Sequence, residues 1–92
     1  MTSRRAELAL PPDEAWQRLK SAFAKIGKVE DASESTKYLV GKARYGLNPV
    51  RLRISVLSGA APDTSVLDIQ GRGQDIFGGA SRKVIDRLLE AM

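Results

Sequence analysis

Arginine and lysine at alternate positions are the residues of this sequence with the clearest capacity for chemistry. Between residues 50 and 57, Arg51 and Arg53 alternate with apolar side chains, and Lys42 and Arg44 have the same spacing just before. Side chains two positions apart on a β-strand point to the same face of a sheet. The spacing therefore predicts one basic surface, which attracts anionic groups such as phosphates and carboxylates.

We predict that this surface is an interaction face on the uncovered side of an antiparallel sheet. Its candidate binding residues are Arg44, Arg51, Arg53, Lys42, Tyr38 and Arg72. The whole face is expected to comprise Arg5, Glu7, Tyr38, Val40, Lys42, Arg44, Arg51, Arg53, Leu57, Val66, Asp68, Gln70 and Arg72. Two further interpretations are a basic face that only meets solvent, and a face that pairs with a second copy of the chain through Val40, Leu57 and Val66.

A third interpretation is weak binding of single-stranded nucleic acid. Basic side chains would contact phosphates, and Tyr38 would offer an aromatic platform for a base. However, the sequence has no ribonucleoprotein motif, in which glycine and aromatic residues alternate after a basic residue.

Residues suited to catalysis are scarce. The sequence contains no histidine and no cysteine, which excludes imidazole bases, thiolate nucleophiles, disulfides and Cys/His metal sites. Asp68 and Asp75 are the carboxylates best placed for a concave site, and neither has an evident partner for acid–base work. We therefore expect no catalytic residues, no metal, no cofactor and no enzymatic activity.

The glycine-rich stretch over residues 71–81 precedes a predicted helix, whose N-terminal N–H groups could bind an anion. No Lys-Ser or Lys-Thr pair closes it, so it is not a P-loop. We interpret it as a strand-to-helix connection.

The elements that must position these residues follow from hydrophobic periodicity. Alternation predicts strands over residues 4–10, 37–45, 50–57 and 64–72, and a brief strand around Val29 is left open. Apolar residues at helical spacing predict a helix over residues 12–26, with Trp16 and Phe23 as packing anchors two turns apart. A final helix is predicted from Ala80 or Ser81 to the end of the chain, with Ser81 as a candidate N-cap.

These elements define an α+β domain that spans residues 1–92. We predict an antiparallel sheet of four strands, or five if Val29 lies in one, with two helices packed on one face in the order β-α-β-β-β-α. Fifteen Lys and Arg against eleven Asp and Glu make the chain mildly basic. No segment has the length and apolarity of a membrane span, and we expect a cytoplasmic protein.

Two segments resemble the START-like, or helix-grip, superfamily of the polyketide cyclase and lipid-transport type. One is the opening strand followed by Pro11-Pro12 and a helix with an aromatic residue. The other is the last strand and helix, namely residues 65–71, 75–79 and 88–92. The resemblance implies a curved sheet that grips the C-terminal helix and encloses an apolar ligand, reduced here because the chain is short.

Two functional hypotheses follow. The first is a small non-catalytic interaction module that binds an unknown partner, or a second copy, through the basic sheet face. The second is a reduced START-like binder of an apolar small molecule, which requires a cavity of roughly 300 Å³ or more beneath the C-terminal helix. The residues that would line this cavity are Trp16, Phe23, Leu52, Ile54, Leu67, Ile69, Ile85 and Leu89.

Overall fold

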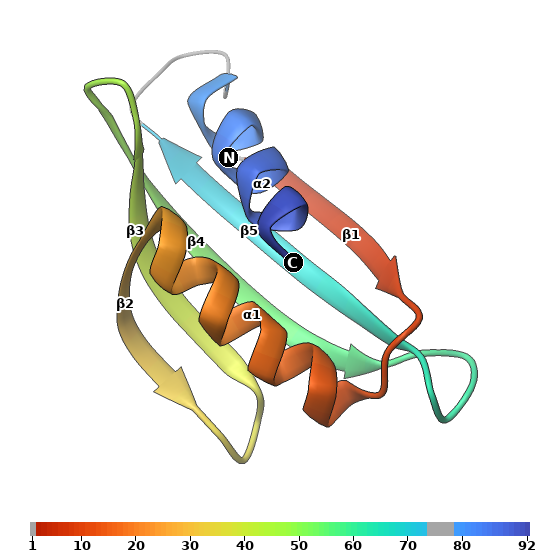
Figure 1. Cartoon of the computed structure of the whole chain (residues 1–92). Coiled ribbons are helices and arrows are strands. Elements are labelled where there is room, and N and C mark those ends of the chain that lie inside the picture. The colour runs from red at the N-terminus through yellow and green to blue at the C-terminus, as the bar shows by residue number, and fades with distance from the viewer. Residues whose placement is uncertain (1, 74–78) are drawn as a thin grey trace.

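The computed structural model describes residues 2–73 and 79–92, which form five strands and two helices (Figure 1). The strands are β1 (Thr2–Leu8), β2 (Gly27–Ser33), β3 (Tyr38–Tyr45), β4 (Asn48–Ser58) and β5 (Ser65–Gly73). The helices are α1 (Pro12–Ile26) and α2 (Gly79–Ala91). The predicted α+β class is confirmed, and Val29 does lie in a strand, so the order is β-α-β-β-β-β-α.

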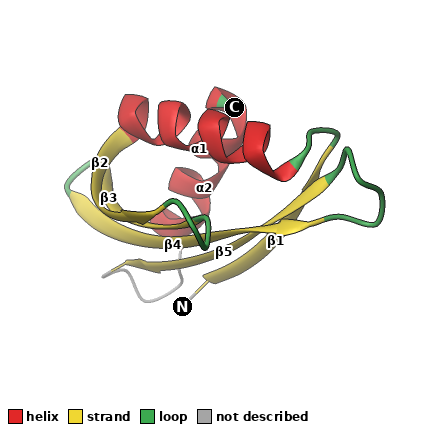
Figure 2. Cartoon of the chain, turned by 90° about the horizontal axis from the view of Figure 1, so that it is seen from below, coloured by secondary structure: helices red, strands yellow, loops and turns green. Residues whose placement is uncertain are grey.

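The five strands form one antiparallel sheet in the order β1-β5-β4-β3-β2. The strands β1 and β2 are therefore the two edges, and α1 joins them by crossing the whole sheet. The helices α1 and α2 lie side by side on the same concave face, as Figure 2 shows. The other face of the sheet carries no helix.

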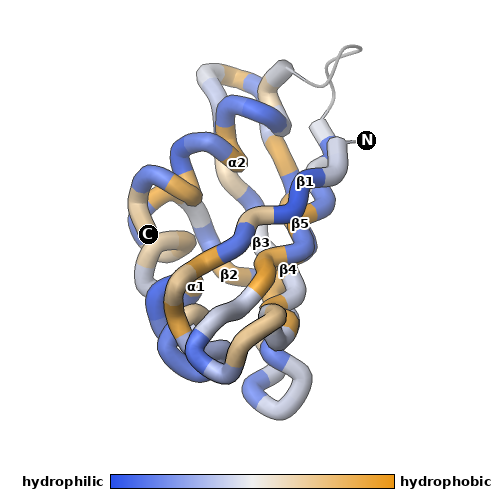
Figure 3. Tube along the Cα trace, turned by 90° about the vertical axis from the view of Figure 1, so that its right-hand side faces the viewer, coloured by the Kyte–Doolittle hydropathy of each residue, from blue (hydrophilic) through white to orange (hydrophobic). Residues whose placement is uncertain are grey.

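Alternation along the strands separates a buried face from an open one. In β4, Val50, Leu52, Ile54 and Val56 are buried beneath the helices. Arg51 lies on the open side, like every second residue of this strand. The same alternation of hydrophobic and hydrophilic residues is visible along the trace in Figure 3. The period of two therefore assigns the two faces as predicted.

The helix α1 begins after Pro11, whose carbonyl accepts a hydrogen bond from the Ala15 N–H at 2.9 Å. Asp13 and Glu14 in the first turn complement the positive end of the helix dipole. The helix buries Ala15, Trp16, Leu19, Ala22 and Phe23. The ring of Phe23 lies directly over Gly41 of β3, where a side chain would collide with it. This contact confirms that Gly41 lets a helix approach the sheet closely.

Two local predictions differ from the structure, and a third concerns residues that it does not describe. The first strand covers Thr2–Leu8 rather than residues 4–10, although Leu10 still packs against the core. Ser81 is not an N-cap, because α2 already begins at Gly79 and the Ser81 hydroxyl is buried without a hydrogen-bond partner. Residues 74–78, which include Asp75 and the centre of the glycine-rich stretch, lie outside the described residues.

No helix in residues 2–73 and 79–92 has the length and apolarity needed to cross a membrane.

Replacement of Gly41 by alanine is expected to destabilise the fold by about 1–3 kcal/mol, the usual cost of overpacking a core. A Cβ atom at this position would lie 2.3 Å from Phe23 Cε1 and 2.7 Å from the Lys28 carbonyl oxygen, and the backbone oxygen cannot move aside freely. The free energy of unfolding in urea measures the effect. Gly71→Ala is the matched control, because its Cβ would meet only side-chain atoms, the closest being Leu52 Cδ2 at 3.0 Å. An equal or larger loss for Gly71→Ala would contradict the prediction.

Candidate functional site: the open sheet face

Four basic residues stand opposite one another in a row across four adjacent strands. Lys28 of β2 pairs with Lys42 of β3, Lys42 with Arg51 of β4, and Arg51 with Arg72 of β5. Neighbouring strands are about 4.8 Å apart, so each positive side chain has another beside it. We call these four residues, Lys28, Lys42, Arg51 and Arg72, the basic row.

A single carboxylate contacts the basic row among the described residues. Glu30 Oε1 lies 3.2 Å from Arg51 Nε, and Glu30 Oε2 lies 3.7 Å from Lys42 Nζ. Glu30 lies on this face because it is two residues after Lys28 on β2, and alternate residues of a strand point to the same side of the sheet. Both ion pairs are solvent-exposed and contribute little, of the order of 0–1 kcal/mol. Positive charge therefore remains in excess along the row.

A hollow of about 130 Å³ lies on the open face between β4 and β5. It is lined by Arg51, Arg53, Gln70, Gly71 and Arg72. Arg53 stands opposite Gln70, and this pair is the next one on the open face after Arg51 and Arg72. Within the described chain, neither Arg53 nor Arg72 has an ion pair or a side-chain hydrogen bond. The hollow thus presents two free guanidinium groups and one amide, all of which can donate hydrogen bonds to an oxyanion.

A second hollow, of about 380 Å³, continues from the first toward the β3–β4 turn. It shares Arg51 and Arg72 with the first hollow and adds Lys42. A third hollow, of about 500 Å³, adjoins Lys28, Lys42 and Arg44. The depressions of this end of the face therefore follow the basic row.

The structure brings most of the predicted interaction residues together, but Tyr38 lies at their margin, one open-face pair from Arg53 and away from the basic row. Tyr38 pairs with Ser55, two pairs of the open face away from the Lys42–Arg51 pair. At about 3.3 Å per residue this is roughly 13 Å along the strand. Tyr38 therefore does not form a stacking platform over the basic row.

The far end of the open face is mixed in character. Leu57 stands opposite Val66, and Asp68 Oδ2 lies 3.8 Å from Arg5 Nη2. Val40 lies nearer the basic row, beside Arg53. The three apolar residues considered for self-association are thus not one patch.

Lys28 and Glu30 belong to this site but were not identified from the sequence. Both residues lie in a segment of mostly polar residues, Gly27–Ser33, whose strand character is weak in the sequence. By contrast, Arg51 and Arg53 alternate with apolar residues, and this pattern predicted their position on the open face.

The residues of the alternative ligand pocket form the centre of the core. Trp16 is 2% exposed, Leu89 is partly buried, and the other six are fully buried in the same cluster. None of these eight residues lines any hollow found in the described part of the chain. An apolar ligand between the sheet and the helices would have to displace side chains that already pack together.

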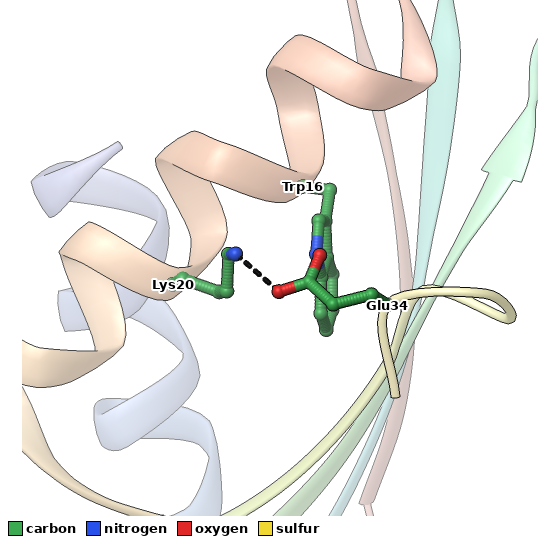
Figure 4. A network of polar contacts seen from close by, with 3 residues as sticks. All are labelled: Trp16, Lys20 and Glu34. Carbon is green, nitrogen blue, oxygen red and sulfur yellow. Dashed lines mark hydrogen bonds and ion pairs between the residues drawn. The ribbon is translucent and has the colours of Figure 1, made fainter. Parts of the chain in front are cut away.

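The indole N–H of Trp16 has a hydrogen-bond acceptor within the protein. Its Nε1–H donates a hydrogen bond of 2.5 Å to Glu34 Oε2 in the β2–β3 turn, and Lys20 Nζ lies 2.6 Å from Glu34 Oε1 (Figure 4). Lys20 also lies over the indole ring, 5.4 Å from its centroid. Hydrogen bonds from Lys20 and then from Trp16 lower the pKa of Glu34 below its ordinary value. This network fastens the β2–β3 turn to α1.

Comparison with solved structures places this arrangement among START-like folds. The chain superimposes on an uncharacterized protein from Bacillus thuringiensis with a TM-score of 0.58 and 12% identity, covering 98% of this chain and 93% of the other. A START superfamily protein from Mycobacterium smegmatis gives a TM-score of 0.52 at 12% identity, covering 98% of this chain and 92% of the other. The protein XoxI from Bacillus cereus gives a TM-score of 0.51 at 13% identity, covering 98% of this chain and 93% of the other. No model of a known protein family matches this chain, and neither does any curated protein sequence.

The fold is therefore START-like, as the opening and closing segments predicted. The START superfamily protein from M. smegmatis is matched over 92% of its own length, so the two chains are of similar size. At 12–13% identity the likeness is one of fold.

Replacement of Glu34 by glutamine is expected to lower the melting temperature near neutral pH and to have little effect in acid. The pKa of Glu34 is lower in the folded protein, so its stabilising effect is present above the unfolded value of about 4.3 and is lost as pH falls through the folded value. Thermal unfolding followed by circular dichroism at several pH values measures the difference from wild type. Asp63→Asn removes an exposed loop carboxylate and serves as the control. A Glu34→Gln difference that persists unchanged into acid would contradict this explanation.

Proposed function

We propose that this protein is a non-catalytic interaction module that binds an anionic partner through the basic row and the adjacent Arg53. The observation that carries the proposal is the row itself, four basic side chains at directly opposed positions of four strands. Three of its members, Lys42, Arg51 and Arg72, also line the hollows of this end of the face.

The energetics of the basic row support a binding role. Like charges directly opposite each other in a sheet are destabilising, by a few tenths of a kcal/mol or more per pair. No packing requirement places them there, because the open face carries no helix. A bound anion would remove this repulsion, so the arrangement is unfavourable when the face is empty and favourable when it is occupied.

A non-catalytic role is consistent with the fact that the carboxylates near the site form ion pairs. Asp68, the described carboxylate that we considered for catalysis, forms an ion pair with Arg5. Glu30 forms ion pairs with Arg51 and Lys42.

The double variant Arg53→Glu/Arg72→Glu is expected to lose at least about tenfold in affinity for heparin, used as a soluble polyanion probe. Both side chains would donate charge-assisted hydrogen bonds, which contribute roughly 1.5–3 kcal/mol each. The same variant is expected to be at least as stable as wild type, since the Arg72→Glu change places a carboxylate opposite Arg51 on the neighbouring strand. Titration over a salt series and urea unfolding measure the two effects.

The variant Arg5→Glu/Arg18→Glu makes the same change in net charge away from the basic row and is the control. It should stay within about twofold of wild type in heparin affinity, because surface charges beyond a Debye length of about 8 Å are screened. Equal losses in the two double variants would mean that only net charge matters, and the proposed site would be wrong.

Nucleic acid is one polyanion that could occupy the face. The separation of Tyr38 from the basic row leaves phosphate contact without base stacking, which favours only weak binding independent of sequence. Titration with a labelled single-stranded oligonucleotide tests this variant of the proposal; affinity that differs strongly between base compositions would contradict it.

The second candidate, binding of an apolar small molecule between the sheet and the helices, rests on the START-like fold. The filled core argues against it. A neutral apolar dye is therefore expected to show no saturable binding to the folded protein. Saturable binding that is abolished by a larger side chain at Ile85 or Leu67 would favour this candidate over the interaction module.

A further inference from the structure

Leu47 in the β3–β4 turn is the most exposed large hydrophobic residue of the described chain. Its side chain is 94% exposed, against 40% for Leu57 and 37% for Tyr45. A single exposed leucine is ordinary in a soluble protein. Its position at the apex of a hairpin, directly beyond the basic end of the sheet, is what gives it significance.

The turn that presents Leu47 is held in place by its neighbours. Gly46 adopts φ of 63°, a left-handed conformation that glycine accepts without strain. Next to it, the Tyr45 ring lies 5.2 Å from the guanidinium carbon of Arg87 on α2. The base of the turn is thus anchored to the helix layer, while Leu47 is exposed in the turn. The β3–β4 hairpin forms one end of the molecule (Figure 1).

Positive charge is concentrated behind this apex. Arg44 is three residues from Leu47, while Arg51 and Lys42 of the basic row are four and five residues away. At about 3.3 Å per residue these distances are roughly 10–17 Å along the strands. The same end of the molecule contains the end of α1, with Lys25, and the beginning of α2, with Lys83 (Figure 1).

Carboxylates gather at the opposite end of the long axis, where α1 begins and the β2–β3 and β4–β5 connections lie (Figure 1). They include Asp13, Glu34 and Asp63, of which Asp13 is paired with Lys37 and Glu34 with Lys20, so this end lacks the excess of positive charge found at the hairpin end. The molecule is 39 Å long, so the two ends are separated by several Debye lengths. The charge distribution therefore orients the hairpin end toward a negatively charged surface.

We propose that the β3–β4 hairpin docks on the surface of an anionic phospholipid bilayer. Leu47 enters the boundary between headgroups and acyl chains, Arg44 contacts the lipid phosphates, and the basic row is attracted to the anionic surface from close by. This inference rests on the proposed function, because it names the anionic partner of the basic row. Insertion of an apolar apex by about 5–10 Å brings Arg44 to the headgroups and the row to within about one Debye length of them.

A bilayer fits the hairpin better than the other anionic partners do. Nucleic acid offers phosphates to the basic row but no apolar phase for a projecting leucine. An acidic protein would need a pocket shaped to bind Leu47, whereas a bilayer can accept this side chain anywhere on its surface. Apolar insertion combined with attraction to anionic lipid is the usual basis of reversible membrane association.

The test is cosedimentation of the intact protein with phosphatidylcholine vesicles that contain or lack phosphatidylglycerol. Wild type is expected to bind only the anionic vesicles, more weakly as salt rises. Leu47→Glu should reduce partitioning by at least about tenfold while its heparin affinity stays within about twofold of wild type. Leu57→Glu makes the same change at the other exposed leucine and should bind vesicles like wild type.

Insertion itself can be read out at single positions, because the sequence contains no cysteine. Leu47→Cys and Leu57→Cys each provide one site for an environment-sensitive fluorophore. A blue shift on anionic vesicles is expected at position 47 and not at position 57. An equal response at both positions, or equal losses for Leu47→Glu and Leu57→Glu, would overturn docking through the hairpin.

Failure of the inference is distinguishable from failure of the proposed function. Wild-type protein that binds heparin but no anionic vesicles would overturn the bilayer as partner and leave the anion-binding face intact. Wild-type protein that binds neither would overturn both.

Discussion

The ring of Phe23 rests on the backbone of β3, because Gly41 has no side chain to hold it away. This contact lets α1 lie close across the sheet on its way from the edge strand β1 to the edge strand β2. With α2 beside it, the apolar face is fully occupied, and the described chain has no further element for the other side. One close approach between a helix and a glycine thus determines which face of the sheet meets the surroundings.

The face that is left open is free of packing constraints, and its composition is therefore informative. Val50 and Leu52 must be apolar, since they lie under the helices. Arg51 and Arg53 could have been almost any residue without harm to the core. Their charge, repeated at Lys42 and Arg72 on the neighbouring strands, weakens the sheet slightly, and this cost is one reason for the binding role that we propose. The apolar and the basic side chains are thus two separate faces of the same strands, and only the apolar face is packed against the helices.

Much of this organisation could be predicted from the sequence. Alternation in β4 correctly indicated which side chains face the helices, and the spacing of Trp16 and Phe23 indicated the buried side of α1. What could not be predicted depends on pairing between strands. The register that sets Lys28 beside Lys42, and the ion pair between Glu30 and Arg51, arise from contacts between segments distant in sequence.

Two further observations show where prediction from local sequence fails. The hydrogen bond from Trp16 to Glu34 joins a helix to a turn and has no local signal. Ser81 shows the converse error, because a residue of the right type for a cap lies inside the first turn of the helix that it was expected to cap.

The position of β1 in the sheet has a consequence for how the chain acquires its structure. This strand pairs only with β5, so Arg5 finds its partner strand at Asp68, near the other end of the sequence. Contacts of such long range form slowly. During synthesis β1 leaves the ribosome before β5 and must stay unpaired until β5 follows. Its charged residues Arg4, Arg5 and Glu7 disfavour aggregation in the meantime.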